Sequence, residues 1–238
     1  MNPDILKNGF RELNLSYDKN KNEKFEKYKE LLKDWNQKIN ITAIKDDEEI
    51  YIKHFLDSII IINKDMESEK KSIIDVGTGG GFPGIPLKIA NINYEVTLLD
   101  SLRKRIDFLS IVVKELGLDG VNLIHGRAED FGRNEKYREK FDICVSRAVA
   151  PLNILSELCI PFVKIGGYFA AYKSENISEE IEISENAIIK LGGKIKEIKE
   201  IRIPSSNIIR KIVIIEKVKS TEKNYPRKAG KPNKDPLI

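Results

Sequence analysis

Apolar residues recur every three or four positions near the start of the chain, which is the pattern of amphipathic helices. One such face is formed by Phe25, Tyr28, Leu31, Leu32 and Trp35. A second face is formed by Ile50, Phe55, Ile59 and Ile62, and two acidic residues that can cap its start precede it, Asp46 and Asp47. The pattern predicts a layer of helices over residues 1–67, with the charged segment 67–71 as a connection to the next part.

From Ser72 onward, short apolar runs alternate with longer amphipathic segments. Strands are predicted for residues 72–76, 95–100, 121–125, 141–146, 167–172, 194–203 and 210–218. Helices are predicted for residues 83–90, 103–116, 151–163 and 179–191. Alternating strands and helices indicate an α/β fold with a mostly parallel sheet. Only the turn 204–207 separates the last two strands, so one of the seven strands is predicted to be antiparallel.

The formal net charge of +4 is unevenly distributed over the 238 residues. From Lys217 to the end there are seven basic and two acidic residues, which leaves 34 basic and 35 acidic residues in the first 216 positions. A basic terminal segment either contacts nucleic acid or is simply solvated. We therefore divide the chain into a helical extension (1–67), a core (68–219) and a basic tail (220–238).

The composition argues against several classes of protein. The sequence has no run of about twenty apolar residues and no signal-peptide pattern. Cys144 and Cys159 lie in apolar segments without CxxC spacing, so we interpret them as buried, reduced thiols. Two histidines and two cysteines also make a metal site improbable. These features predict a cytoplasmic protein that needs no metal and no membrane.

The segment DVGTGGGFPG, from Asp75 to Gly84, lies between the first predicted strand and the following helix. A glycine loop in that position binds nucleotide-like ligands at the carboxyl end of the strand. Residues 79–84 match the G-x-G-x-x-G of dinucleotide-binding proteins, but glycine-rich loops produce such matches by chance. Counted from Gly77, the first glycine after the strand, the pattern is G-x-G-x-G, and Phe82 stands where a dinucleotide fingerprint needs glycine.

Two acidic residues favour one type of cofactor. Asp75, at the tip of the strand, would repel a pyrophosphate but attract the sulfonium and ammonium groups of S-adenosylmethionine. Asp100 closes the second strand 19 positions after Gly81 and is placed to accept both hydroxyls of a ribose. Each has a structural alternative, since Asp75 can cap a turn and Asp100 can cap the next helix. Together with the glycine loop, they favour S-adenosylmethionine.

Several motifs then resemble one family of proteins. They are DVGTGGGFPGIPL from Asp75, LDSLRKR from Leu99, GRAED from Gly126 and VSRA from Val145. Together with WNQKINIT from Trp35, KHFLDS from Lys53 and YPRKAGKP from Tyr225, they are similar to the RsmG (GidB) family of small-subunit ribosomal RNA guanine-N7 methyltransferases. The resemblance covers nearly the whole chain. It implies a class I (Rossmann-like) S-adenosylmethionine-dependent methyltransferase core behind an N-terminal helical extension.

The resemblance also implies which residues bind the cofactor. Gly77, Gly79 and Phe82 would line its methionine and adenosine part, and Asp100 would hold its ribose. Further along the chain, the adenine edge would meet Ala128 and Glu129. Arg147, after the fourth strand, would lie beside the cofactor and the target base. An ion pair of Arg147 with Asp75 or Asp142 is the structural alternative.

The implied substrate is small-subunit (16S) ribosomal RNA or the small ribosomal subunit, bound by a monomer. Guanine N7 has a lone pair and no proton to lose, so direct in-line transfer needs no general base, and we assign no catalytic acid or base. Arg147 and four basic residues near strand ends are predicted to form an RNA-facing rim: Lys104, Arg127, Lys173 and Arg210. Taken singly, each of these four is more simply a solvated charge, and His54 is interpreted as structural. Two other functions stay open, an NAD-dependent oxidoreductase and a non-catalytic RNA-binding assembly factor with this fold.

Overall fold

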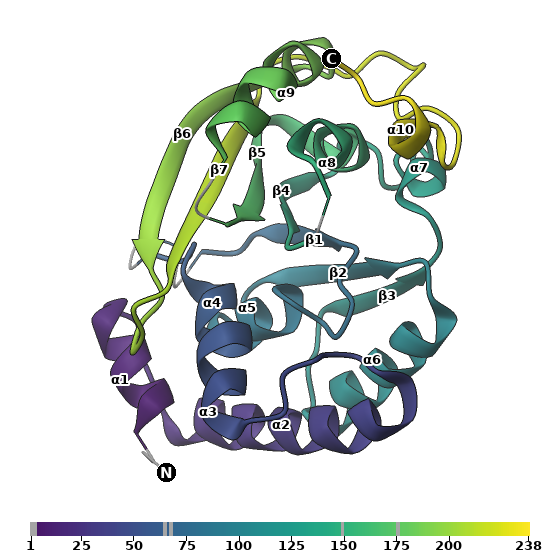
Figure 1. Ribbon diagram of the computed structural model, residues 1–238. Helices are drawn as coiled ribbons and strands as arrows, with labels where there is room; N and C mark the ends of the chain where they lie inside the picture. The colour runs from purple at the N-terminus through teal and green to yellow at the C-terminus, as the bar shows by residue number, and fades with distance from the viewer. Residues whose placement is uncertain (1–3, 64–65, 67–68, 149, 175–176) are drawn as a thin grey trace.

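The computed structural model describes residues 4–63, 66, 69–148, 150–174 and 177–238, so the predicted boundary at 67–68 lies outside the described residues (Figure 1). The N-terminal helices are α1 (Ile5–Glu12), α2 (Lys19–Ile39) and a continuous helix made of α3 (Asp47–Glu49), the π-helical η1 (Ile50–Leu56) and α4 (Asp57–Ile59). As predicted, the Asp46 side chain caps α3 by accepting a hydrogen bond from Glu49 N at 3.0 Å. Asn40 ends α2 in the left-handed conformation, with φ of 47°.

Seven strands form one sheet, as the sequence predicted. They are β1 (Ser72–Val76), β2 (Glu95–Asp100), β3 (Val121–His125), β4 (Phe141–Ser146), β5 (Val163–Lys173), β6 (Gly193–Arg202) and β7 (Ile209–Lys217). Their order in the sheet is β3-β2-β1-β4-β5-β7-β6. β7 pairs antiparallel with both β5 and β6, and the other pairs are parallel. The carboxyl ends of β1, β2 and β4 therefore meet at one edge.

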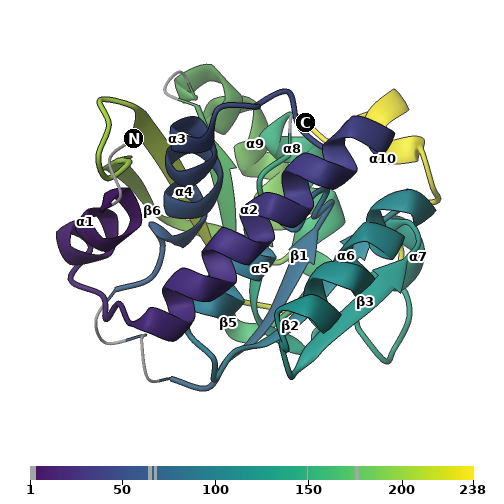
Figure 2. The same ribbon diagram turned by 90° about the horizontal axis from the view of Figure 1, so that it is seen from below.

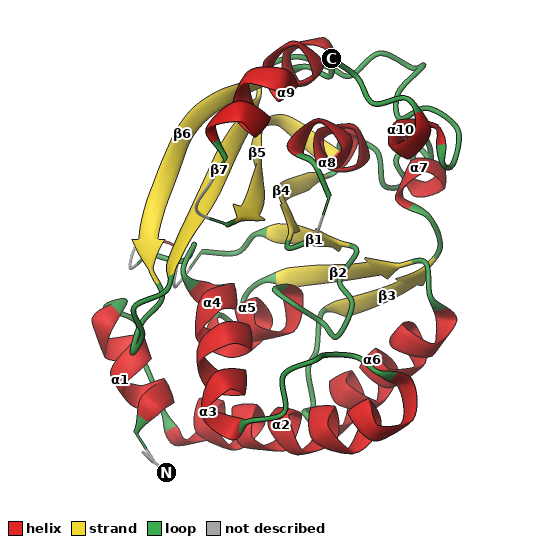
Figure 3. Cartoon of the chain, in the orientation of Figure 1, coloured by secondary structure: helices red, strands yellow, loops and turns green. Residues whose placement is uncertain are grey.

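Helices cover both faces of the sheet (Figure 3). Successive residues of β1 point to opposite faces, because Ile73 belongs to one hydrophobic core and Ile74 to the other. The first face is covered by α5 (Gly84–Ala90), α6 (Arg103–Glu115) and the N-terminal helices, and Figure 2 shows α2 passing in front of α5 and running beside α6. The second face is covered by α8 (Leu152–Cys159), η3 (Ile160–Phe162) and α9 (Ser178–Lys190).

One predicted helix is wrong at its end. The helix expected over residues 151–163 stops at Cys159, continues as the single turn η3, and β5 begins at Val163. Pro161 explains the difference, because a proline has no N–H to donate and its ring disturbs the preceding helical turn. The remaining predicted strands and helices of the core have their ends within a few residues of those observed, the largest difference being the start of β5 at Val163.

The tail, residues 220–238, packs against the core and ends near α8 (Figure 1). It contains the short helix α10 (Lys231–Lys234), which contacts α8, and its Leu237 is buried in the second core. Arg138 donates hydrogen bonds to the carbonyls of Thr221 and Tyr225, both at 2.6 Å, and Arg133 to that of Pro226 at 2.6 Å. The tail is therefore an ordered part of the fold. No helix among the described residues is long and apolar enough to span a membrane.

Candidate active site

The glycine loop lies over the carboxyl end of β1. Gly77, Gly79 and Gly81 have φ values of 72°, 60° and 97°, which side chains with a Cβ rarely adopt. A Cβ added to Gly77 would meet no atom within 4 Å, and one added to Gly79 would meet only a carbonyl oxygen at 3.9 Å. The backbone of these two glycines therefore faces open space, where a ligand can approach it closely.

Asp75 is completely buried beneath this loop. Its Oδ2 accepts hydrogen bonds from Thr78 Oγ1 at 2.7 Å and from Gly84 N at 2.8 Å. Its Oδ1 has no hydrogen-bond partner among the described residues. Burial raises the pKa of this carboxyl group to about 7. One oxygen therefore has the turn-capping role that the sequence analysis left as an alternative, and the other is an orphaned buried acceptor that suits a cationic ligand.

Asp100 connects the loop to the next strand. Its Oδ2 accepts hydrogen bonds from Gly79 N at 2.9 Å and from the Arg105 guanidinium at 3.2 Å, and its Oδ1 accepts one from Leu102 N at 2.9 Å. The side chain is 3% exposed. Asp100 thus stabilises both the glycine loop and the turn that enters α6.

A cleft of about 700 Å³ opens beside the loop. Five predicted site residues line it, of which Gly77, Gly79 and Phe82 belong to the glycine loop. Arg147 and Arg210 line it too, from the end of β4 and the start of β7. The helical extension contributes a further wall, made of Ile41, Ile44, Lys53, His54 and Asp57. From the sequence, this extension was predicted only as a layer of helices, and its place at the site was not predicted.

Asp57 joins the two arginines of the cleft. Its Oδ2 accepts a hydrogen bond from Arg147 at 2.8 Å, and both of its oxygens accept from Arg210, at 2.8 and 3.0 Å. The carboxylate is 1% exposed, and the side chains of Arg147 and Arg210 are 15% and 22% exposed. The structural alternative for Arg147 was an ion pair with Asp75 or Asp142. Its partner is instead Asp57, so this alternative named the wrong carboxylates. A buried carboxylate between two arginines leaves one positive charge in excess.

His54 and Phe82 form a stacked pair in the same wall. Their ring centroids are 4.4 Å apart and their planes differ by 7°, and the Arg147 guanidinium lies 5.2 Å from the Phe82 centroid. His54 Nε2 bonds Thr42 Oγ1 at 2.8 Å, and its Nδ1 lies 3.3 Å from an Arg147 nitrogen. Burial, with a contribution from Arg147, lowers the pKa of His54 to about 3, so the imidazole is neutral. His54 therefore lines the cleft with both ring nitrogens close to polar partners, and its interpretation as a structural residue stays a prediction.

Ala128 and Glu129, expected to meet the adenine, begin the short helix α7 (Ala128–Phe131) just after β3. This segment adjoins Asp100, whose carbonyl accepts a hydrogen bond from Gly126 N at 3.0 Å. Glu129 is 8% exposed, and its Oε1 accepts a hydrogen bond at 2.9 Å from Gly230 N of the tail. Neither Ala128 nor Glu129 lines the 700 Å³ cleft, so the predicted cofactor residues form a strip that extends past it.

The predicted RNA-facing rim divides into two groups. Lys104 and Arg127 are exposed beside the carboxyl ends of β2 and β3, as a rim requires. Lys173 is wrong as a rim residue, because it is 9% exposed and its ammonium group binds Ala150 O at 2.7 Å and Glu180 at 2.5 Å. Arg210 lines the cleft, but its guanidinium is engaged by Asp57.

Sequence reasoning missed Asp57 and assigned no site role to its neighbour Lys53. The signal was present, because Asp57 follows His54 by three residues and Lys53 by four, so it shares a helical face with both. The described residues hold no group of three or more histidine, cysteine, aspartate or glutamate side chains arranged to bind a metal ion.

The sheet order, the glycine loop and the acids beneath it define the class I methyltransferase fold. Solved structures of the same fold include a SAM-dependent methyltransferase from Aquifex aeolicus, with a TM-score of 0.54 and 17% identity over 75% of this chain and 97% of that one. Another is Aeropyrum pernix fibrillarin with natively bound S-adenosyl-L-methionine, with a TM-score of 0.50 and 14% identity over 62% of this chain and 67% of that one. At these identities the likeness establishes the fold.

The family model of GidB, described as rRNA small subunit methyltransferase G, matches residues 21–209. A protein of Alkaliphilus metalliredigens named ribosomal RNA small subunit methyltransferase G is 51% identical over 98% of both chains. The protein of that name from Clostridium novyi is 51% identical over 99% of this chain and 97% of its own. The chain belongs to the GidB family.

Proposed function

We propose that the protein methylates N7 of a guanine in small-subunit (16S) ribosomal RNA, by direct in-line transfer from S-adenosylmethionine without a general base. Its family membership and the names of its relatives support the RNA substrate. The same findings favour a methyltransferase over the NAD-dependent oxidoreductase suggested by the literal G-x-G-x-x-G. They also weigh against the non-catalytic assembly factor, which no observation of the structure favours.

The residues around the loop fit the proposed cofactor. S-adenosylmethionine supplies a methyl group on a cationic sulfur when it is bound. The open backbone of Gly77 and Gly79 gives it room, and the unpartnered Oδ1 of Asp75 offers negative charge beneath the loop. We assign the ribose to Asp100. The remaining cofactor contacts are assigned to Phe82, Ala128, Glu129 and Arg147.

The residues that line the cleft support methyl transfer without a general base. Its ionisable lining residues are four basic side chains, one carboxylate and one imidazole: Lys53, Arg105, Arg147, Arg210, Asp57 and His54. Asp57 is held by two guanidinium groups, and His54 is bonded through Nε2 to Thr42. Neither is free to accept a proton from a substrate. Guanine N7 has no proton to give up, so this cleft is suited to it.

The work left to the protein is orientation. Holding two reacting groups in line at near-attack distance supplies roughly 7–11 kcal/mol of a barrier. Arg147 is fixed by Asp57 and by the Lys53 carbonyl at 3.0 Å, and it lies over Phe82, so it forms a rigid wall for a planar base. The excess positive charge of the cleft attracts the RNA backbone.

The test is methyl transfer by the purified protein. With S-adenosylmethionine and small subunits or 16S ribosomal RNA from a strain that lacks the gene, we expect one new 7-methylguanosine by mass spectrometry of the digested RNA. Unchanged 7-methylguanosine content in RNA from that strain, compared with its parent, would refute the proposal. Assaying naked RNA against intact subunits identifies the substrate form. Sedimentation tests the proposed monomer, and cell fractionation tests the proposed cytoplasmic location.

A further inference from the structure

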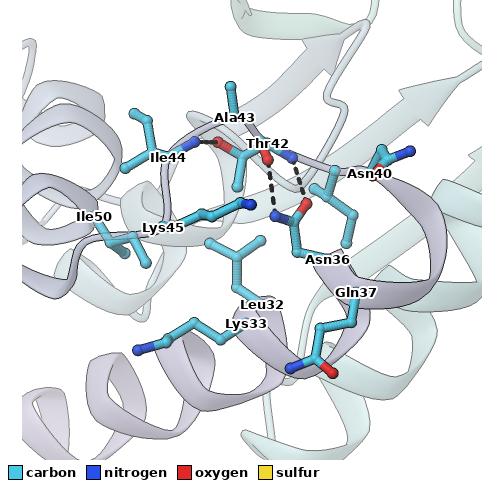
Figure 4. A pocket seen from close by; sticks show the side chains of 11 residues that line it. Leu32, Lys33, Asn36, Gln37, Asn40, Thr42, Ala43, Ile44, Lys45 and Ile50 are labelled. Atoms are coloured by element: carbon cyan, nitrogen blue, oxygen red, sulfur yellow. Dashed lines mark hydrogen bonds between the residues drawn. The ribbon is translucent and has the colours of Figure 1, made fainter.

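A second hollow, which we call the α2 groove, lies beside the cleft. It has a volume of about 860 Å³ and is bounded by the C-terminal half of α2, the loop 40–46 and the start of η1 (Figure 4). Ile41 and Ile44 line both the groove and the cleft. The loop is therefore a shared wall, and an extended ligand in the cleft can continue over it into the groove.

Hydrogen bonds hold this wall in place. Asn36 Nδ2 donates to Thr42 O at 2.8 Å, and Thr42 N donates to Asn36 Oδ1 at 2.8 Å, as the dashed lines in Figure 4 show. Thr42 Oγ1 also accepts a hydrogen bond from Ile44 N at 3.0 Å and bonds His54. The groove is thus preformed. Through Thr42, its wall is hydrogen-bonded to His54, which stacks on Phe82 in the cleft.

The lining of the groove has an apolar floor and a polar rim. Leu32 and Ile50 are fully buried beneath its base, and its accessible apolar surface comes from the half-buried Ile41 and Ile44 and the exposed Ala43. The rim carries the amides of Gln37 and Asn40 and the exposed ammonium group of Lys45. An apolar surface receives the flat face of a nucleobase, amides bond its edge, and an ammonium group binds its phosphate.

The charges of the groove complement a polyanion. Its ionisable lining residues are Lys33 and Lys45, and it has no carboxylate among them. Lys33 is paired with Asp47, whereas the described part of the chain gives Lys45 no hydrogen-bond or ion-pair partner. In Figure 4, Lys45 lies across the groove above Leu32. In the adjoining cleft Arg105 is paired with Asp100 and Lys53 with Glu49, and Asp57 leaves one of the two charges of Arg147 and Arg210 in excess. Both hollows therefore have a net positive charge.

We propose that the α2 groove binds the nucleotide next to the guanosine that occupies the cleft, as part of the same RNA strand. The inference rests on the proposed function, since it takes the cleft as the site of the target base. It gives the N-terminal extension a direct part in choosing the sequence context of the methylated base.

The experiment compares three full-length variants on the same RNA. We expect Lys45→Glu to raise KM for RNA about tenfold. We also expect it to reduce the slope of the logarithm of the binding constant against the logarithm of the salt concentration by about one. We expect Gln37→Ala to raise KM about threefold, as the loss of one neutral hydrogen bond does. In both variants, kcat and the dissociation constant for S-adenosylmethionine are expected to stay within about twofold of wild type, since a subsite for a neighbouring nucleotide adds binding energy outside the reacting centre. Lys114→Glu, an exposed lysine at the far end of α6, is the matched control and should leave KM unchanged.

A photoreactive amino acid in place of Gln37 tests the position of the RNA directly. We expect its cross-link at a nucleotide adjacent to the methylated guanosine. Wild-type KM for Lys45→Glu, or a cross-link far from that guanosine, overturns the inference while methyl transfer itself persists. An effect of Lys45→Glu on whole subunits but not on naked RNA also overturns it, because the groove would then bind a ribosomal protein. Absence of methyl transfer by the wild-type protein would instead refute the proposed function.

Discussion

The two ends of the chain both reach the candidate site, but they do so in different ways. The N-terminal extension places side chains in the cleft itself, with Asp57 between two arginines and His54 against Phe82. The C-terminal tail supplies a backbone N–H, from Gly230, to the buried Glu129. The first end therefore contributes to the surface proposed to meet the base, whereas the second supports a residue proposed to meet the cofactor.

Several basic residues near the C-terminus form ion pairs within the fold. The basic composition of the tail suggested an RNA-binding or solvated arm, yet Arg227 binds the buried Glu157 at 2.7 Å. Just before the tail, Lys217 at the end of β7 binds Glu139 at 3.2 Å. Lys231 is paired with Asp235 at 2.6 Å. Much of the positive charge is thus satisfied within the fold, so net charge alone is a poor guide to which surface meets RNA.

Replacing Asp57 with asparagine should have the largest effect. The change leaves two half-buried guanidinium groups without a counter-charge, and breaking a buried pair in this way costs about 3–5 kcal/mol. We expect a loss of this order in the free energy of unfolding, measured by urea denaturation, and a fall in kcat because Arg147 loses its anchor.

Asp34→Asn is the matched control, because Asp34 is exposed on α2 of the same extension. It should change neither the stability nor the activity. If Asp57→Asn were as stable as this control, the two arginines would be solvated, and the extension would have no electrostatic role in the site.

Removing residues 229–238 should have the next largest effect. The truncation deletes the N–H that binds Glu129, and a hydrogen bond to a charged group contributes about 1.5–3 kcal/mol. We expect the dissociation constant for S-adenosylmethionine, measured by calorimetry, to rise about tenfold or more, with smaller changes in RNA binding. The contrary prediction, weak RNA binding with normal cofactor affinity, follows if the tail is an RNA-binding arm.

A double-mutant cycle separates this effect from general destabilisation. In a Glu129→Gln background, the truncation should cost less cofactor affinity than in the wild type, since the two changes act on the same hydrogen bond. Equal losses in both backgrounds would show that the tail acts through the stability of the fold alone.

The core of the fold was predictable because local pattern and topology agree there. The strand from Ser72 to Val76, the glycine loop and the final hairpin each have a sequence signature of their own. The ion pairs of the site lack such a signature. Asp57 is 90 residues from Arg147 and 153 from Arg210, and only the packing of the extension on the sheet brings them together. For the same reason Lys173, predicted at a rim, lies buried against Glu180.

The role of Asp75 can be tested through pH. Its pKa is raised to about 7 by burial, so below pH 7 the carboxyl group is increasingly protonated and loses its attraction for a cationic cofactor. Between pH 7 and 5.5, affinity for S-adenosylmethionine should fall by up to about tenfold per pH unit. Asp75→Asn keeps an oxygen for Thr78 and Gly84 and should bind weakly without this pH dependence. A pH-independent wild type would limit Asp75 to capping the loop.

The smallest effect concerns His54, and it tests how tightly the N-terminal extension closes on the cleft. The pKa of His54 is lowered from 6.5 to about 3, so on acidification the unfolded chain takes up a proton that the folded protein does not. The stability contributed by its neutral form is complete above pH 6.5 and is lost as the pH falls below that value, by at most about 1.4 kcal/mol per unit. His54→Gln removes this term, whereas the titration of Asp75, which has the opposite sign, remains in both proteins. From pH 6 to pH 5 the free energy of unfolding of His54→Gln should therefore rise relative to that of the wild type, by at most about 1.4 kcal/mol. Equal slopes would mean that His54 is protonated in the folded state, and that the extension leaves this part of the cleft open to water.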